Sequence, residues 1–252
     1  MMKIFHIVSI FLLSAGLLTL TACCDADEQL TANASSVIVE ITDDGYQTIT
    51  RATENGYRTT FEAGDACGLY IVRNGAVVVE NVKLTATRQG STLTWQAASP
   101  LGGGLNGERY FLYYPYQSDM TGKVTASATG DANFFSSLIS GWAPAANQST
   151  KAAYTSADLM TATGTATRSG NTLRLSFSMS HRMALAVINT SGVSYTFTKS
   201  DAQPYSFSGN LRYIANPSKA VTITGTGTGN TAFVVSTSGI ASGRYKVFNV
   251  VK

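Results

Sequence analysis

Short runs of β-branched and aromatic residues recur along most of this 252-residue chain, with Gly, Asn, Asp or Ser between them. This pattern constrains the fold more than any other feature, because runs of this length are typical of strands joined by turns. Charged residues make up only 13% of the chain, whereas long amphipathic helices usually carry many Glu, Lys and Arg side chains. The sequence therefore predicts an all-β protein.

The expected strands form an earlier and a later group. Short strands at close spacing between residues 58 and 116 indicate a β-sandwich. Between residues 119 and 165 the pattern loosens, and only residues 134–139 are expected to form a helical turn. We interpret the polar Gly/Thr passage that follows as a domain boundary. The expected strands are residues 37–41, 46–50, 58–61, 67–72, 77–79, 83–87, 92–95, 109–116, 173–177, 183–188, 194–198, 205–207, 221–224, 232–236 and 245–251.

The first 22 residues have the pattern of a secretory signal peptide. Lys3 precedes an apolar segment, residues 4–20, that is shorter than a membrane-spanning helix requires. The segment ends in Leu-Thr-Ala-Cys, which resembles the lipobox of bacterial lipoproteins. This resemblance implies cleavage between Ala22 and Cys23, and acylation of Cys23 by fatty acids such as palmitate. The protein would then be anchored by lipid on the cell outer membrane. The alternative is an ordinary signal peptide with a chance cysteine at the cut.

Charge is distributed unevenly along the rest of the chain. Residues 23–50 contain six acidic residues and no basic one, whereas basic residues predominate from residue 52 onward. The acidic segment 25–36 has the composition of a flexible tether. Its first residues, Asp-Ala-Asp-Glu at 25–28, resemble the surface-export signal of Bacteroidetes lipoproteins. Basic residues in the body are scattered singly, so we expect no nucleic-acid partner.

Cysteine and histidine are too few for common site chemistry. Because Cys23 is expected to be acylated, the three cysteines cannot form a disulfide framework, and Cys67 is predicted to fill a small core position. One histidine, His181, remains after the signal peptide, and no Cys-x-x-Cys motif is present, so no standard zinc site can form. The sequence also lacks a nucleophile elbow and a phosphate loop. We therefore expect no metal, no cofactor and no catalytic residue, and we interpret His181 as structural.

Four segments are informative together. They are Phe-Glu-Ala-Gly-Asp-Ala-Cys-Gly-Leu-Tyr at residues 61–70, Tyr-Phe-Leu-Tyr-Tyr-Pro-Tyr at 110–116, Asp-Leu-Met at 158–160 and Phe-Ser-Met-Ser-His-Arg-Met-Ala at 177–184. In order and spacing they resemble the fimbrillin family, Bacteroidetes lipoproteins of the type V pilus kind. The resemblance implies two tandem transthyretin-like Greek-key β-sandwich domains. It also implies exported subunits, many of which are cut at an arginine and polymerise by donor-strand exchange, while others act as anchors or tips.

Arg51 and Ala52 lie where family members are similarly processed. From local residues alone, Arg51 reads as a surface arginine; the resemblance makes a protease site there equally credible. The resulting division is a signal peptide (1–22), a lipidated tether with an N-terminal strand (23–51), an N-terminal sandwich (52–165) and a C-terminal sandwich (166–252). The last domain is short and stops on the strand 245–251. Either the subunit is short, the chain is truncated, or its carboxy terminus cannot donate a strand in the usual way.

Two functions remain open at this point. In the first, the protein is a structural or adhesive subunit of a fimbria and exchanges strands with other fimbrial subunits. In the second, it is a monomeric surface lipoprotein that binds glycan or another host or bacterial surface ligand through exposed aromatic rings. Alternate members of the tyrosine run facing inward as core would argue against the second function. The aromatic candidates are Trp95, Tyr110, Tyr113, Tyr114, Tyr116 and Trp142.

Overall fold

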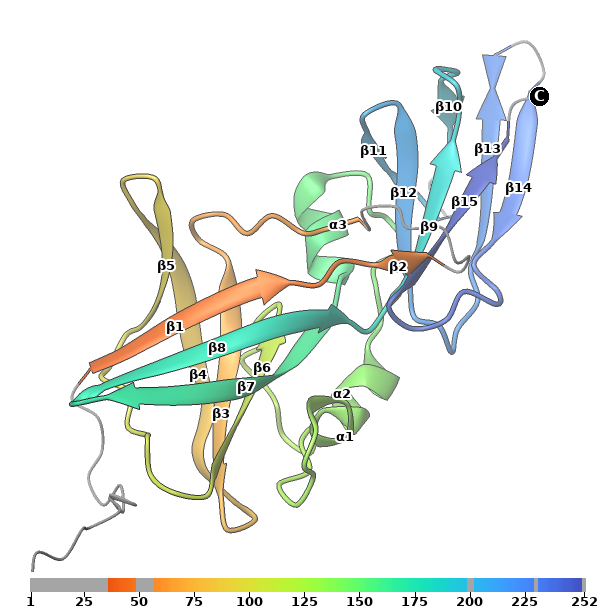
Figure 1. Cartoon of the computed structure of the whole chain (residues 1–252). Coiled ribbons are helices and arrows are strands. Elements are labelled where there is room, and N and C mark those ends of the chain that lie inside the picture. Colours follow the sequence, from red (N-terminus) through yellow and green to blue (C-terminus); the bar gives the residue numbers. More distant parts are fainter. Residues whose placement is uncertain (1–35, 49–56, 199–201, 229–230, 251–252) are drawn as a thin grey trace, which may run out of the picture.

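The computed structural model describes residues 36–48, 57–198, 202–228 and 231–250 (Figure 1). Strands predominate in these ranges, which confirms the predicted all-β fold. Helices α1 (Asp131–Phe134) and α2 (Ser136–Gly141) occupy the region expected to form a helical turn, and α3 (Lys151–Ala157) was not predicted. In the described part of the chain, no helix combines the length and the apolar character that crossing a bilayer requires.

The larger sheet has seven strands in the order β1-β8-β7-β6-β3-β4-β5. Its neighbouring strands are antiparallel, except that β1 runs parallel to β8. β1 also contacts β5, at the opposite end of this order, so the sheet curls until its two edge strands meet. The strands are β1 (Ser36–Asp43), β3 (Ala66–Arg73), β4 (Ala76–Gln89), β5 (Thr92–Ala97), β6 (Glu108–Tyr114), β7 (Met160–Ser169) and β8 (Thr172–His181).

Strand β6 is buried on both of its faces. Tyr110 and Tyr114 face the core inside the curled sheet, together with Trp95. Phe111 and Tyr113 face a second core, which α1 and α2 cover; there the ring of Phe111 stacks on Phe134 with centroids 4.2 Å apart. The tyrosine run is therefore core on both sides. Most of the aromatic residues considered for glycan binding are buried, and Tyr116 and Trp142 are half-buried.

Two further sheets form the C-terminal half. A five-stranded sheet has the order β11-β12-β9-β15-β2, and a three-stranded sheet has the order β10-β13-β14. Apolar side chains of both sheets share one core. The strands are β2 (Gln47–Thr48), β9 (Ala184–Asn189), β10 (Tyr195–Thr196), β11 (Tyr205–Phe207), β12 (Asn210–Ala215), β13 (Thr222–Gly227), β14 (Ala232–Ser236) and β15 (Arg244–Asn249).

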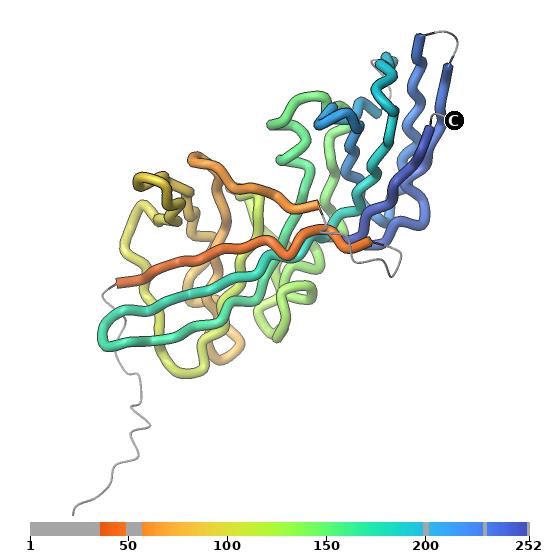
Figure 2. The backbone as a smooth tube through the Cα atoms, turned by 45° about the horizontal axis from the view of Figure 1, so that its top comes forward, coloured from red at the N-terminus to blue at the C-terminus, as the bar shows by residue number. Residues whose placement is uncertain are grey.

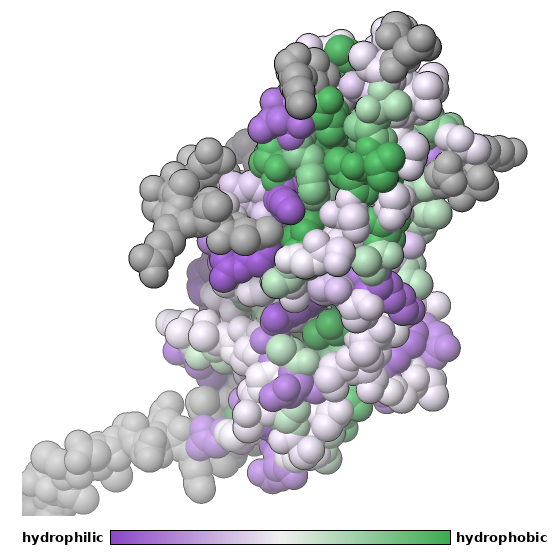
Figure 3. Space-filling view, turned by 90° about the vertical axis from the view of Figure 1, so that its right-hand side faces the viewer, coloured by the Kyte–Doolittle hydropathy of each residue, from purple (hydrophilic) through white to green (hydrophobic). Residues whose placement is uncertain are grey.

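The C-terminal half carries exposed apolar side chains. Figure 3 shows hydrophobic residues gathered over the C-terminal strands, whereas more polar residues cover the region below them. Val234 on β14 is 68% exposed and Val247 on β15 is 42% exposed.

Several details of the sequence prediction need correction. The polar passage taken as a domain boundary is strand β7, and the boundary at residues 165 and 166 falls inside it. Strands β7 and β8 form a hairpin in the larger sheet, so the change from one group of sheets to the other occurs between β8 and β9. Strand β12 was not predicted, residues 58–61 are not a strand, and the two strands expected at 77–79 and 83–87 are the single strand β4.

Candidate functional site

The segment before Arg51 runs across both halves of the molecule. We call residues 36–48 the leader segment; it contains β1 and β2. Figure 2 shows it extending alongside β8 and on to the C-terminal half. The strand, turn and strand predicted here are present, but the two strands do not pair with each other. β1 pairs with β8, and β2 pairs with β15.

The inner face of β1 completes the core of the larger sheet. Val39 is only 6% exposed, and the half-buried Val37 and Ile41 pack against the same core. Ile38, on the outer face, is 41% exposed. This alternation is what a half-buried strand requires, because successive side chains point to opposite faces. Full burial of one such aliphatic side chain stabilises the fold by about 1.5–3 kcal/mol.

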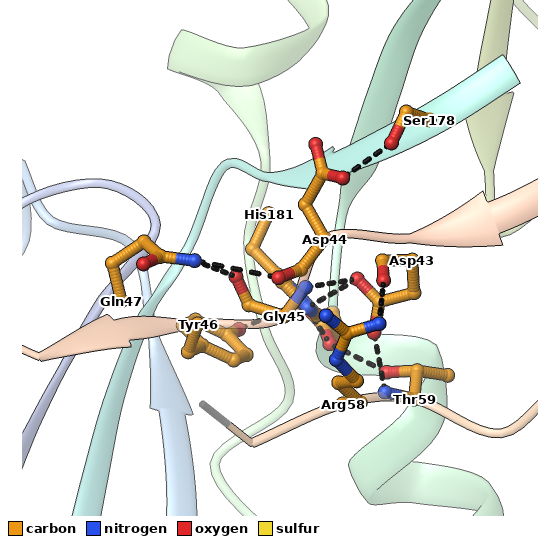
Figure 4. A network of polar contacts seen from close by, with 10 residues as sticks. Asp43, Asp44, Gly45, Tyr46, Gln47, Arg58, Thr59, Ser178 and His181 are labelled. Atoms are coloured by element: carbon orange, nitrogen blue, oxygen red, sulfur yellow. Dashed lines mark hydrogen bonds and ion pairs between the residues drawn. The ribbon is translucent and has the colours of Figure 1, made fainter. Parts of the chain in front are cut away.

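Polar side chains on the outer face of the sheet also link the leader segment to β8. Glu40 forms an ion pair with Arg174 and accepts a hydrogen bond from Ser176, at 3.3 Å. Asp44 accepts a hydrogen bond from Ser178, shown in Figure 4. The Glu40 pair is half exposed, so we expect it to fix register more than to add stability.

A buried polar cluster fixes the leader segment where β1 ends. We call Asp43, Tyr46, Asp158 and His181 the clasp; two members belong to the leader segment and two to the body. His181 Nδ1 lies 2.9 Å from Asp158 Oδ2, and His181 Nε2 lies within ion-pairing distance of Asp43 Oδ1, at 3.0 Å. The Tyr46 hydroxyl donates to Asp158 Oδ1 at 2.7 Å, and its ring stacks on the imidazole. All four residues are buried.

Backbone groups complete the clasp (Figure 4). Asp43 accepts hydrogen bonds from the Gly45 and Thr59 amides, at 2.7 and 2.5 Å. Arg58 donates to the Asp43 carbonyl at 3.0 Å. Gly45 adopts φ +74, a left-handed conformation that glycine tolerates without strain, and this lets the chain turn back onto the Asp43 carboxylate.

The clasp has a defined charge state near neutral pH. Burial alone would lower the pKa of His181, but the Asp158 and Asp43 carboxylates outweigh burial and raise this pKa to about 9. Burial would raise the pKa of Asp43, but His181 and the two backbone amides hold it below its usual range. Burial, followed by the nearby Asp158 carboxylate, raises the pKa of Tyr46 well above its usual value. A protonated His181 therefore lies between carboxylates from the leader segment and from the body.

The leader segment makes further contacts beyond the clasp. The Gln47 amide donates to the Gly243 carbonyl at 2.9 Å, and Arg244 donates to the Thr48 carbonyl at 3.2 Å. The Tyr46 amide donates to the Tyr57 carbonyl at 2.8 Å. The leader segment thus touches both the larger sheet and the five-stranded sheet.

The residues singled out from the sequence have different outcomes. Cys23, Ala22, Arg51 and Ala52 lie outside the described residues, as does Cys24. Cys67 is a buried core residue, as predicted, and burial followed by the nearby Asp65 raises the pKa of its thiol well above the usual value.

His181 is buried and paired, but its partners were not identified from the sequence. Asp43 lies in the Asp-Asp-Gly sequence between the strands expected at 37–41 and 46–50, and Asp158 opens the Asp-Leu-Met segment, so both were visible as local features. Only the fold shows that these residues, far apart along the chain, meet at one imidazole.

Comparisons with known proteins agree on one family. The sequence model of a family described as fimbrillin-like matches residues 50–244. A protein of Bacteroides ovatus assigned as the fimbrium tip subunit Fim1C is 34% identical over 221 residues, which are 85% of this chain and 40% of the relative. The leader segment, residues 36–48, lies before the region that the family model matches.

Solved structures share the fold. A crystal structure of a fimbrial protein from Bacteroides ovatus superposes with a TM-score of 0.72 at 27% identity, covering 86% of this chain and 49% of that one. A protein of Bacteroides uniformis assigned to cell adhesion superposes with a TM-score of 0.51 at 14% identity, covering 86% and 91% of the two chains, and shows the shared fold alone. This chain spans less than half the length of the protein assigned as the tip subunit and of the fimbrial protein with the TM-score of 0.72.

Proposed function

The chain belongs to the fimbrillin-like family, and on this premise we propose that it is a structural or adhesive subunit of a cell-surface fimbria, assembled by donor-strand exchange. The observation that carries the proposal is the position of β1. It is the first strand of the described chain and forms one edge of the larger sheet. It pairs in parallel with β8 on one side and contacts β5 on the other. A strand supplied by another subunit can occupy the same edge.

Removing β1 would leave a groove that favours a replacement strand. The backbone of β8 would lose its partner along the edge, and unpaired edge groups readily accept another strand. Apolar side chains of β8, among them Leu175 and Phe177, would lose the cover of Val39 and its neighbours. Backbone pairing and burial of apolar side chains together would drive the exchange.

The position of Arg51 is consistent with this proposal. The leader segment ends at Thr48, and the described chain resumes at Tyr57. A cut after Arg51 would separate β1 and β2 from the body, and it would leave strands β3 to β15 on one chain.

We further propose that Cys23 carries the lipid anchor. Because Cys23 precedes β1, a cut after Arg51 would detach the body from the anchor as well as from the leader segment. One proteolytic step would thus open the groove and free the subunit from the membrane.

Limited digestion of the native protein with trypsin tests the assembly proposal. We expect the first cut after Arg51, read as a new amino terminus at Ala52, and association of the trimmed body when it is mixed with related subunits. The variant Arg51→Ala should remain folded, uncut at this position and monomeric. If the trimmed body stays monomeric in such mixtures, the polymerising role is wrong, and a lipid-anchored surface binding protein becomes the better explanation.

A further inference from the structure

A second site lies beside the clasp and belongs mainly to the body. A pocket of about 370 Å³ opens between the chain at Tyr57–Glu62, helix α3 and strands β11 and β12, which meet at the junction of the two halves in Figure 1. This volume is at the lower end of the range for small-molecule sites. Tyr46 and Asp158 of the clasp form part of its wall.

Arg212 on β12 is held in an unusual position in this pocket. Its guanidinium lies over two aromatic rings, with Cζ 4.7 Å from the centroid of Tyr57 and 4.4 Å from that of Phe207. Burial raises the pKa of Tyr154, and the nearby positive charge of Arg212 opposes this rise. Cation–π contacts with two rings therefore hold the guanidinium in place.

The charge of Arg212 lacks a carboxylate partner. Arg73, Arg174 and Arg182 each form an ion pair with a carboxylate. Over the ranges that the structure describes, Arg212 forms none, and its Nε has no hydrogen-bond partner. A partly buried guanidinium in this state gains from an incoming carboxylate, because the planar fork of arginine matches the two carboxylate oxygens.

Aromatic rings form the adjoining wall. The ring of Tyr205 neighbours those of Tyr154 and Phe207, with centroids 5.1 Å and 6.0 Å away and planes inclined by 24° and 28°. Phe207 is 45% exposed, which is high for a phenylalanine. Such rings offer apolar surface to the C–H groups of a sugar.

The rim of the pocket supplies hydrogen-bonding groups of both kinds. Lys151 and Glu62 form an exposed ion pair of 2.6 Å, and the exposed Thr60 adds a hydroxyl. Sugar hydroxyls both donate and accept hydrogen bonds, so a mixed rim suits them better than a purely cationic rim, which would favour phosphate.

From this arrangement we infer that the pocket binds an acidic saccharide, with the sugar carboxylate on Arg212 and the sugar ring against Tyr205 and Phe207. Arg212 and both rings belong to the body, so they would stay together after the proposed cut, whereas Tyr46 of the pocket wall would leave with the leader segment. The site differs from the residues that the sequence offered for glycan binding, none of which lines this pocket.

The inference is tested by titrating sugars into the purified full-length protein and measuring their binding by saturation-transfer difference NMR. The probes are N-acetylneuraminic acid, galacturonic acid and glucuronic acid, with galactose and glucose as neutral counterparts and acetate as a carboxylate without a sugar. We expect at least one acidic sugar to bind saturably, and about tenfold or more tighter than its neutral counterpart or acetate.

Variants locate the site. Arg212→Met should weaken binding of the acidic sugar by about tenfold or more, and Arg212→Lys should weaken it less, because an ammonium keeps the charge but loses the fork. Arg168→Met, which replaces a half-buried arginine on β7, should bind as the parent protein does. Thermal unfolding checks that each variant is folded. If Arg212→Met does not fold, the comparison of Arg212→Lys with the parent protein decides whether Arg212 binds the sugar.

Four results would overturn the inference. The first is that no acidic sugar binds saturably. The second is that the folded Arg212 variants bind as tightly as the parent protein. The third is that acetate binds as well as the acidic sugars, which would make the site a simple anion site. The fourth is that neutral sugars bind equally well, which would remove the role of the carboxylate.

Discussion

The ring of Tyr46 lies nearly parallel to the imidazole of His181, with centroids 3.8 Å apart and planes inclined by 21°. Tyr46 belongs to the leader segment and His181 ends strand β8 of the body. This stacked pair joins two parts of the chain that the proposed cut would separate. Departure of the leader segment would therefore expose a charged imidazole that is now almost completely buried.

Two substitutions of Tyr46 should weaken the attachment of the leader segment to different extents. Tyr46→Phe removes the hydroxyl that donates to Asp158 and should lower the free energy of unfolding by about 1–3 kcal/mol. Tyr46→Ala also removes the buried ring and should lower it by about 3–5 kcal/mol. Urea denaturation of the uncut protein measures both changes.

Tyr116→Phe is the matched control for the tyrosine hydroxyl. Tyr116 is half-buried outside the clasp, so its substitution should change the free energy of unfolding by less than about 0.5 kcal/mol. Equal stability of Tyr46→Phe and the parent protein would show that the hydroxyl bond to Asp158 contributes nothing.

The stability of the uncut protein should depend on pH through His181. The pKa of His181 is about 9 in the folded protein and about 6.5 in an unfolded chain. A raised pKa stabilises the fold fully below about pH 6.5, and this contribution is lost as the pH rises through about 9. The full contribution is about 3 kcal/mol, at 1.36 kcal/mol for each pKa unit. The lowered pKa of Asp43 acts in the opposite direction, and its contribution is lost only in acid, below 3.8.

Comparison with His181→Gln isolates this dependence. Urea denaturation between about pH 6 and pH 10 should give a falling free energy of unfolding for the parent protein and a flatter profile for the variant. The variant will be less stable throughout, so the difference in slope is the informative quantity. Parallel profiles would contradict a protonated His181 in the clasp.

Two neighbouring positions on β1 should respond very differently to truncation. Val39→Ala removes buried methyl groups and should lower the free energy of unfolding by about 1–2 kcal/mol. Ile38→Ala changes an exposed side chain and should have an effect below about 0.5 kcal/mol. Urea denaturation again gives the values. A larger effect at Ile38 than at Val39 would mean that β1 packs with its opposite face inward.

The lipid anchor should depend on one cysteine of two. Cys23→Ala should abolish incorporation of labelled fatty acid and partition of the protein into a detergent phase, because the thiol is the group that is acylated. Cys24→Ala, at the next position, should retain both properties. Unchanged labelling of Cys23→Ala would contradict the proposed anchor.

The sequence predicted most strands because their apolar runs are short and bounded by turn residues. It did not predict β7, because much of that strand is solvent exposed and its residues are small and polar. Strand β8 supplies most of the core residues of this hairpin, among them Phe177. A Cβ atom at Gly164 would lie 2.4 Å from the ring of Phe177, so glycine is required there by close packing. A single glycine in a polar passage does not reveal this contact.

The clasp and the pocket could not be predicted for a related reason. The partners of His181 are the last residue of β1 and the residue that follows α3, and nothing local indicates that both carboxylates reach the same imidazole. Arg212 lies on β12, a strand that the sequence did not indicate, and its two flanking rings come from different segments. These arrangements depend on long-range pairing, whereas the core position of Cys67 could be predicted from residue type alone.

The parallel register of β1 and β8 has a mechanical consequence. Ser36 lies beside Thr172, and Asp43 lies beside Met179. The chain continues from the C-terminal end of β8 into β9 of the C-terminal half, and β1 ends beside the same end of β8. A pull on the chain before Ser36, resisted by the C-terminal half, would load the two strands in shear. The hydrogen bonds along β1 would then share the force, and they would not open one at a time from an end.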